Sequence, residues 1–409
     1  MTGRRGRWPG RATTQADWPL MALQSAVVFG DAALPLALSW IAYDLSRSLT
    51  LMAALYVVES LVPLAAGLAI TPWISRFGPH RTLGLSQWGR ALMLGGVLVL
   101  YGTGWRLGLF VWLFLAAGGI GTGVVLSEAA VRALIPALGA SATAYAGRLE
   151  RVGAMVRLAA LPAAGIVLAT AGVSGLLAIL TGISMVGGAL TPAAAPGAHA
   201  PPAARPTHPA AGLQLLWRIA PLRSLALQAL VGNFGYTLVM GALLFYLRTS
   251  LHLSAIGVSL TMAALSLGSI LGTLALPPLL RRLRRGVLYP LFLTGGLIGT
   301  LMLQIPRPWA PAAGEALVAA CDTAWVVMST GLRLQLIPAR DRTVVLTASR
   351  LVSNLMVPAG GAIVATLGPL VGVPALFLAA AAAKAAEIAI AGSRDIRRID
   401  AGRCCAMGT

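Results

Sequence analysis

Long apolar runs separated by short arginine-rich segments are the feature that most constrains this chain. Hydrophobic residues make up 57% of its 409 residues, charged residues make up 11%, and the mean hydropathy is +0.82. A soluble domain carries about 25% charged residues, so this chain lacks the polar side chains that would cover a globule in water. About 20 apolar residues cross a bilayer as a helix. The sequence therefore predicts an all-α membrane protein with twelve transmembrane helices.

The distribution of basic residues predicts the orientation. With the N-terminus inside, 24 of the 31 basic residues fall in inner segments, three fall within predicted spans, and four fall in outer segments. Because positive residues accumulate on the cytoplasmic side, we expect a multi-pass protein of the inner (cytoplasmic) membrane with both termini cytoplasmic. The net charge of +19 then matches anionic lipid headgroups. No basic face interleaved with aromatic residues indicates a nucleic-acid partner.

An internal repeat predicts two pseudo-symmetric six-helix halves in the same orientation. Four groups of residues recur at one offset of 202 positions: Gly30-Asp31 with Gly232-Asn233, Ser127 with Ser329, residues 134–137 with 336–339, and Ala146, Arg148 and Leu149 with Ala348, Arg350 and Leu351. We expect five segments: a cytoplasmic tail (1–17), the N-terminal half (18–190), a cytoplasmic linker rich in Pro and Ala (191–212), the C-terminal half (213–391) and a second cytoplasmic tail (392–409).

Motifs for nucleotide, metal or covalent chemistry do not occur in the sequence. It has no G-x-x-x-x-G-K-[ST] loop, which argues against ATP-driven transport by this chain alone. Its four histidines are scattered, and Cys321, Cys404 and Cys405 lack the spacing of a metal site or a disulfide framework. We therefore expect no enzymatic activity, no cofactor, no catalytic residue and no metal site.

Three stretches carry a resemblance to a known family. The first stretch, residues 29–67, contains a Gly-Asp pair and then the turn Tyr43–Ser48. The second, residues 212–272, begins with Gly-Leu and continues through Trp-Arg and Pro-Leu-Arg. The third, residues 333–361, reads RLQLIPARDRTVVLTASRLVSNLMVPAGG. In these stretches the chain resembles the major facilitator superfamily, and within it the bacterial branch that exports macrolides, siderophores and related compounds. The resemblance covers residues 18–390.

The resemblance implies a function and a mechanism. It implies a secondary active transporter, a proton-coupled exporter of amphipathic small molecules, whose two halves rock around a central cavity. An uptake carrier of the same fold is one alternative, and a degenerate carrier that acts as a membrane sensor or accessory protein is another. The expected partners are a small-molecule substrate, protons and the lipid bilayer, and we expect a monomer.

Ionisable residues within the predicted spans are the candidates for function, because charge inside a bilayer is costly. The resemblance places the first span beside the cavity, so Asp31 is the first candidate for proton coupling, although a purely structural Gly-Asp packing unit remains open. Asn233 occupies the mirror position without a charge. Asp322 and Glu59 are further candidates for the cavity, and Arg90 is a candidate counter-ion.

Lys384 and Glu387 also fall within a predicted span, the last one. They are three residues apart, which places them on one face of a helix. We therefore expect these two side chains to neutralise each other rather than to act on cargo.

The resemblance also implies a cytoplasmic gate in the segment 71–81. The family pattern has an opening Gly where this chain has Thr71 and an Asp where it has Ser75, while Arg76, Gly78 and Arg81 match the pattern. A neutral hydrogen bond contributes about 1 kcal/mol less than a charge-assisted one, so we expect a weaker latch and a resting state open to the cytoplasm. The candidate gate residues are Arg76, Gly78, Arg81, Arg132, Arg148 and Arg350.

The topology can be tested with cysteines introduced into a variant that lacks the three native ones. A cysteine at Ala200, in the predicted linker, should react with an impermeant maleimide only after the cells are permeabilised. A cysteine at Trp105, in a predicted outer segment, should react in intact cells. Labelling of position 200 from outside would reverse the orientation.

Overall fold

The computed structural model describes residues 18–67, 70–134, 142–191, 209–337 and 341–391. The first part of the chain forms helices α1 (Trp18–Ser46), α2 (Leu49–Gly67), α3 (Ile70–Phe77), α4 (Pro79–Thr103), α5 (Arg106–Leu134), α6 (Ala142–Thr170) and α7 (Gly172–Leu190). The second part forms α8 (Pro209–Arg218), α9 (Ala220–Thr249), α10 (Ala255–Arg282), α11 (Arg285–Met302), α12 (Ala310–Leu336), α13 (Arg342–Asn354), α14 (Met356–Thr366), α15 (Gly368–Val371) and α16 (Val373–Ala391).

Twelve helical segments in the described ranges are long and apolar enough to cross a membrane. Helices α13 and α14 together supply one of them, over Val344–Thr366, whereas α3, α8 and α15 are too short. Helices suit this setting because each backbone N–H and C=O group is satisfied within its own segment, where lipid offers no partner. The predicted fold class, an all-α protein with twelve membrane-spanning helices, is confirmed.

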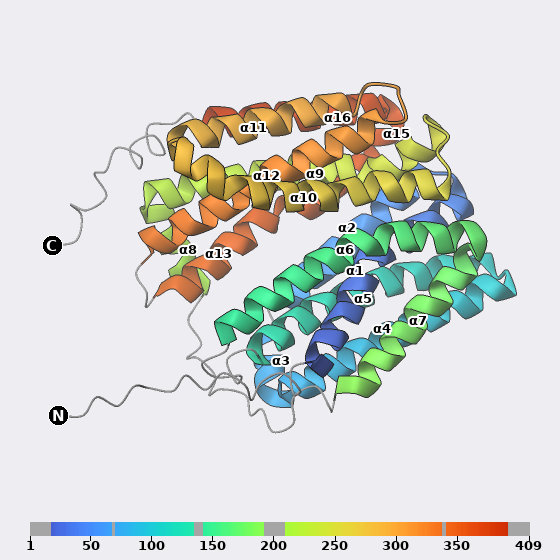
Figure 1. Cartoon of the computed structure of the whole chain (residues 1–409). Helices are drawn as coiled ribbons and strands as arrows, with labels where there is room; N and C mark the ends of the chain where they lie inside the picture. Colours follow the sequence, from blue (N-terminus) through green and yellow to red (C-terminus); the bar gives the residue numbers. More distant parts are fainter. Residues whose placement is uncertain (1–17, 68–69, 135–141, 192–208, 338–340, 392–409) are drawn as a thin grey trace, which may run out of the picture.

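The helices form two bundles, α1–α7 and α8–α16, which lie side by side in Figure 1. We call the end that carries α3, α8 and the first turns of α13 the basic end. The opposite end, where α1 turns into α2 and α9 turns into α10, is the far end.

Close packing between the two bundles lies toward the far end. A Cβ atom added at Gly361 of α14 would lie 2.8 Å from the Val57 side chain of α2, and one at Gly368 of α15 would lie 2.8 Å from Leu49. Gly165 of α6 makes a similar close approach to α10. In Figure 1 the ribbons of the two bundles converge at the far end and diverge toward the basic end.

The structure differs from the sequence-based expectation at the end of the linker. Helix α8 begins at Pro209, inside the predicted linker 191–212, and the rest of that segment, 192–208, lies outside the described residues. Leu216 of α8 packs in a small core with Val345 of α13. Gly212 allows this approach, because a Cβ atom there would lie 2.5 Å from a backbone oxygen of α13. Tertiary packing therefore orders a segment whose own composition predicts a loop.

Two glycines one turn apart let α10 and α12 pack closely. Cβ atoms added at Gly268 and Gly272 would overlap the backbone carbonyl oxygens of Ala316 and Ala320. Small residues at this spacing bring helix backbones together in membranes, where packing rather than the hydrophobic effect holds helices to each other.

Replacing Gly268 by Val should therefore lower the free energy of unfolding by about 1–3 kcal/mol, because the added side chain has no room against Ala316. The matched control is Gly182→Val in α7, where a Cβ atom would meet nothing within 4 Å. Thermal unfolding of the two purified variants in detergent checks this. Equal stability losses would contradict the close approach of α10 and α12.

Candidate functional site

A buried ion pair joins α1 and α4 in the first bundle. Arg90 of α4 donates a hydrogen bond to Asp31 of α1. The Arg90 side chain is 3% exposed and that of Asp31 is 25% exposed. A Cβ atom at Gly30 would lie 3.2 Å from the Arg90 guanidinium, so the glycine beside Asp31 makes room for the cation. The structure thus places two of the candidate residues in direct contact.

A second buried ion pair joins α12 and α16 in the other bundle. The Lys384 amino group of α16 lies 2.8 and 3.0 Å from the two carboxylate oxygens of Asp322 on α12. Its distance to Glu387 Oε1, on the same helix, is 3.4 Å. The expected ion pair between Lys384 and Glu387 is present, but Asp322, 62 residues away in the sequence, is a second and nearer partner of Lys384.

The repeat-related glycines Gly30 and Gly232 make room for side chains of opposite charge in the two bundles. Gly30 faces Arg90 from α4, whereas Gly232 faces Glu387 from α16, whose Oε1 would lie 2.5 Å from an added Cβ atom. The repeat therefore keeps a small residue at this position of the first helix of each bundle. The charged side chain that fills the space comes from helices that are not equivalent in the repeat.

Asn233, the mirror of Asp31, ties α9 to the break between α13 and α14. Its side-chain amide donates to the backbone oxygen of Ser353 at 2.8 Å and to Asn354 Oδ1 at 3.2 Å. Pro358 lies just beyond and has no N–H for the helix ladder. In the structure, Asn233 makes contacts that support this break.

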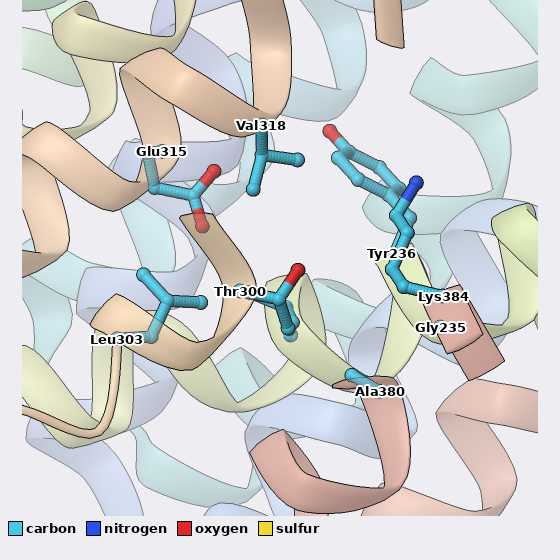
Figure 2. A pocket seen from close by; sticks show the side chains of 9 residues that line it. Gly235, Tyr236, Thr300, Leu303, Glu315, Val318, Ala380 and Lys384 are labelled. Atoms are coloured by element: carbon cyan, nitrogen blue, oxygen red, sulfur yellow. The ribbon is translucent and has the colours of Figure 1, made fainter. Parts of the chain in front are cut away.

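Glu315 is an ionisable residue of the predicted span 309–331, and in the structure it lies close to the second buried ion pair. It lines a small pocket between α9, α11, α12 and α16 together with Tyr236, Thr300 and Lys384 (Figure 2). Its side chain is almost fully buried, and its Oε2 atom has no hydrogen-bond partner in the described ranges. The signal in the sequence was an acidic residue within an apolar run, which is the signal that also singled out Asp322.

Glu59 of α2 lies near the contact between the two bundles. Its charge acts on Tyr56, which is one turn earlier and whose ring would lie 3.5 Å from a Cβ atom added at Gly361 of α14. Among the described residues, Glu59 has no ion-pair or hydrogen-bond partner for its side chain. It is therefore separate from both buried ion pairs.

The gate candidates divide into those with described contacts and those without. Arg350 of α13 lies 3.5 Å from Glu128 of α5, which makes an exposed ion pair across the two bundles. Gly78 precedes α4 with a φ of 77°, a backbone conformation that favours glycine. Arg76 stacks on the Phe77 ring and Arg81 is exposed. The side chains of Ser75, Arg132 and Arg148 lie outside the described part of the structure.

Metal-ligating side chains do not gather in the part of the chain that the structure describes. No group of three or more His, Cys, Asp or Glu residues there is arranged to hold a metal ion. The two buried ion pairs offer ionic chemistry instead, because each places a carboxylate that can bind a proton next to a buried cation.

Comparison with solved structures identifies the fold. The chain is similar to a bacterial homologue of the iron transporter ferroportin in its inward-facing state (TM-score 0.70, 16% identity, 93% of this chain and 98% of that chain). It is also similar to the nucleoside transporter NupG (TM-score 0.68, 12% identity, 93% and 100%) and to a D-xylose–proton symporter (TM-score 0.66, 13% identity, 91% and 96%). No protein-family model and no curated protein sequence matches. The fold is that of the major facilitator transporters.

Removing the cation of the second pair should destabilise the protein. Lys384→Met leaves Asp322 and Glu387 without their partner, so we expect a loss of about 3 kcal/mol, the low end for a buried pair because Asp322 is 31% exposed. Lys384→Arg retains the charge and should lose less stability than Lys384→Met. Adding Asp322→Asn to Lys384→Met should restore part of the stability. Unchanged thermal unfolding of Lys384→Met would contradict a buried pair.

Proposed function

We propose that this chain is a secondary transporter of small molecules that works by alternating access, as a proton-coupled exporter of amphipathic compounds. The observation that carries the proposal is an ion pair buried in each bundle, Asp31 with Arg90 and Asp322 with Lys384. Charges inside a membrane protein are costly and mark the pathways of ions and substrates. The proposed class of cargo follows from the fold and from the resemblance of the sequence to exporters of macrolides and siderophores.

The two pairs share an asymmetry that suits proton coupling. In each pair the carboxylate is the accessible member, with 25% exposure for Asp31 and 31% for Asp322, while the cations are only 3% and 6% exposed. The carboxylate of each pair is therefore the group that water, and a proton with it, can reach. Protonation removes the negative charge, which leaves Arg90 without its carboxylate and Lys384 with Glu387 alone. This changes the relative free energies of the two conformations.

The arrangement of the bundles supports a state open at the basic end. Their close contacts lie toward the far end. The chain also superimposes better on the inward-facing ferroportin homologue, with a TM-score of 0.70, than on the outward-facing one, with 0.60. With the cytoplasmic orientation that the arginines predict, the cargo enters the transporter from the cytoplasm.

Two alternatives use the same observations. An uptake carrier would need the same pairs, and the D-xylose–proton symporter shares the fold, so direction has to be measured. A sensor or accessory protein would have the fold without transport, and Ser75 at the gate position is the feature that favours it.

Transport by purified protein in vesicles tests the proposal. With an imposed pH gradient and a panel of amphipathic compounds, we expect movement of cargo against its gradient. Asp31→Asn should abolish gradient-driven transport while cargo binding is retained, because the amide keeps the shape and cannot titrate. Asp341→Asn, a like change outside both buried pairs, is the matched control.

Each other result has a definite meaning. Full activity of Asp31→Asn would remove Asp31 from coupling and leave Asp322, Glu59 and Glu315 as the carboxylates to test by the same exchange. Transport in the opposite direction would establish an uptake carrier. Absence of transport for the whole panel, with a folded protein, would favour the sensor.

A further inference from the structure

An open pocket lies at the far end, between the connection from α1 to α2 and the connection from α9 to α10. Its volume is about 420 Å³, and it is lined by Tyr43, Arg47, Arg248, Thr249 and His252. The first two residues belong to the first bundle and the other three to the second. The pocket therefore bridges the two bundles at the end where they are packed together.

Two guanidinium groups meet at one aromatic ring in this pocket. Arg47 lies 5.0 Å and Arg248 lies 5.3 Å from the centre of the Tyr43 ring. Arg248 also lies 4.2 Å over the buried Trp40 ring. Cation–π contacts of this kind hold the guanidinium faces and leave the N–H groups at their edges for other partners.

The N–H groups at the edges of these guanidinium groups have few hydrogen-bond acceptors in the described part of the chain. Arg248 donates one hydrogen bond, to the backbone oxygen of Leu253 at 3.2 Å. Its Nε is buried and has no hydrogen-bond partner within the described ranges. In the same part of the chain, neither Arg47 nor Arg248 has a carboxylate at salt-bridge distance.

Asp44 supplies the negative charge that acts on both arginines. Its carboxylate interacts electrostatically with Arg248 and Arg47. One carboxylate beside two guanidinium groups leaves the pocket with a net positive charge. His252 adds a ring N–H group that can donate to a ligand.

The backbone holds two of the lining residues in an uncommon conformation. Arg47 and His252 both have a φ of 51°, and they are the non-glycine residues with positive φ in the described part of the chain. Such residues cost free energy and gather at functional sites. Glycine would adopt these angles more readily, yet the chain has a cationic residue at one position and a hydrogen-bond donor at the other.

We propose that this far-end pocket binds an anion with a carboxylate or phosphate group. Arg47 from one bundle and Arg248 and His252 from the other donate hydrogen bonds to its oxygens, which guanidinium groups bind with good geometry. Because the ligand contacts both bundles, it binds most tightly when the far end is closed. The anion therefore shifts the population toward the state in which the transporter opens at the basic end.

Phosphate chemistry can come from a dissolved anion or from a lipid headgroup, and the experiment separates these sources. The full chain is placed in phosphatidylcholine nanodiscs and titrated with inorganic phosphate, with sodium chloride of equal ionic strength as the reference. We expect a saturable rise in melting temperature with phosphate. A second sample in nanodiscs that contain phosphatidylglycerol, without added phosphate, tests the headgroup.

Arg47→Gln is the test variant because Arg47 is exposed and its loss leaves the aromatic packing of Arg248 intact. We expect its half-saturating phosphate concentration to rise about tenfold or more, the loss of one charge-assisted contact. The matched control is Arg106→Gln, an exposed arginine at the same end that does not line the pocket; it should respond like the native chain.

A distance measurement gives a second readout. Spin labels at Thr50 of α2 and Ile256 of α10, both exposed near the far end, should show a narrower distribution with a larger closed fraction when phosphate is bound. The same result with phosphatidylglycerol alone, lost in Arg47→Gln, would identify the headgroup as the ligand. Equal responses to phosphate and chloride, or equal responses of Arg47→Gln and Arg106→Gln, would overturn the proposal.

Discussion

The need to pair cations that are buried within an apolar helix bundle governs the interior of this protein. Arg90 and Lys384 are both almost fully buried, and each has a carboxylate from another helix as its partner. A buried cation left alone costs several kcal/mol, so each pair ties together two helices of its bundle. Glycines then supply the space, Gly30 for the guanidinium and Gly232 for the Glu387 carboxylate.

The two bundles share a backbone plan and differ in their chemistry. The sequence repeat places a Gly followed by Asp or Asn in the first long helix of each bundle. Asp31 binds a cation, whereas Asn233 holds the break between α13 and α14 through neutral hydrogen bonds. The acidic partners of Lys384 in the second bundle lie instead on α12 and α16.

The relative strength of the contacts at the two ends explains which end is closed. At the basic end, the described ion pair across the bundles joins Arg350 to Glu128, is exposed and is 3.5 Å long; such pairs contribute about 0–1 kcal/mol. At the far end, Arg248 stacks on the buried Trp40, and close contacts of α14 and α15 with α2 add to it. Cation–π contacts that exclude water contribute up to about 2 kcal/mol each. The balance favours closure at the far end.

The sequence by itself determined the helical class, the twelve spans and the residues that carry charge within them, because span length and apolar composition are local properties of the chain. It could not determine that Lys384 pairs with Asp322 as well as with Glu387, since the contact with Asp322 joins residues 62 positions apart. Nor did composition predict α8, which packing against α13 orders. The pocket of Arg47, Arg248 and His252 exists only because two distant connections meet at the far end. These contacts depend on how helices pack in three dimensions, which periodicity and composition along one segment do not specify.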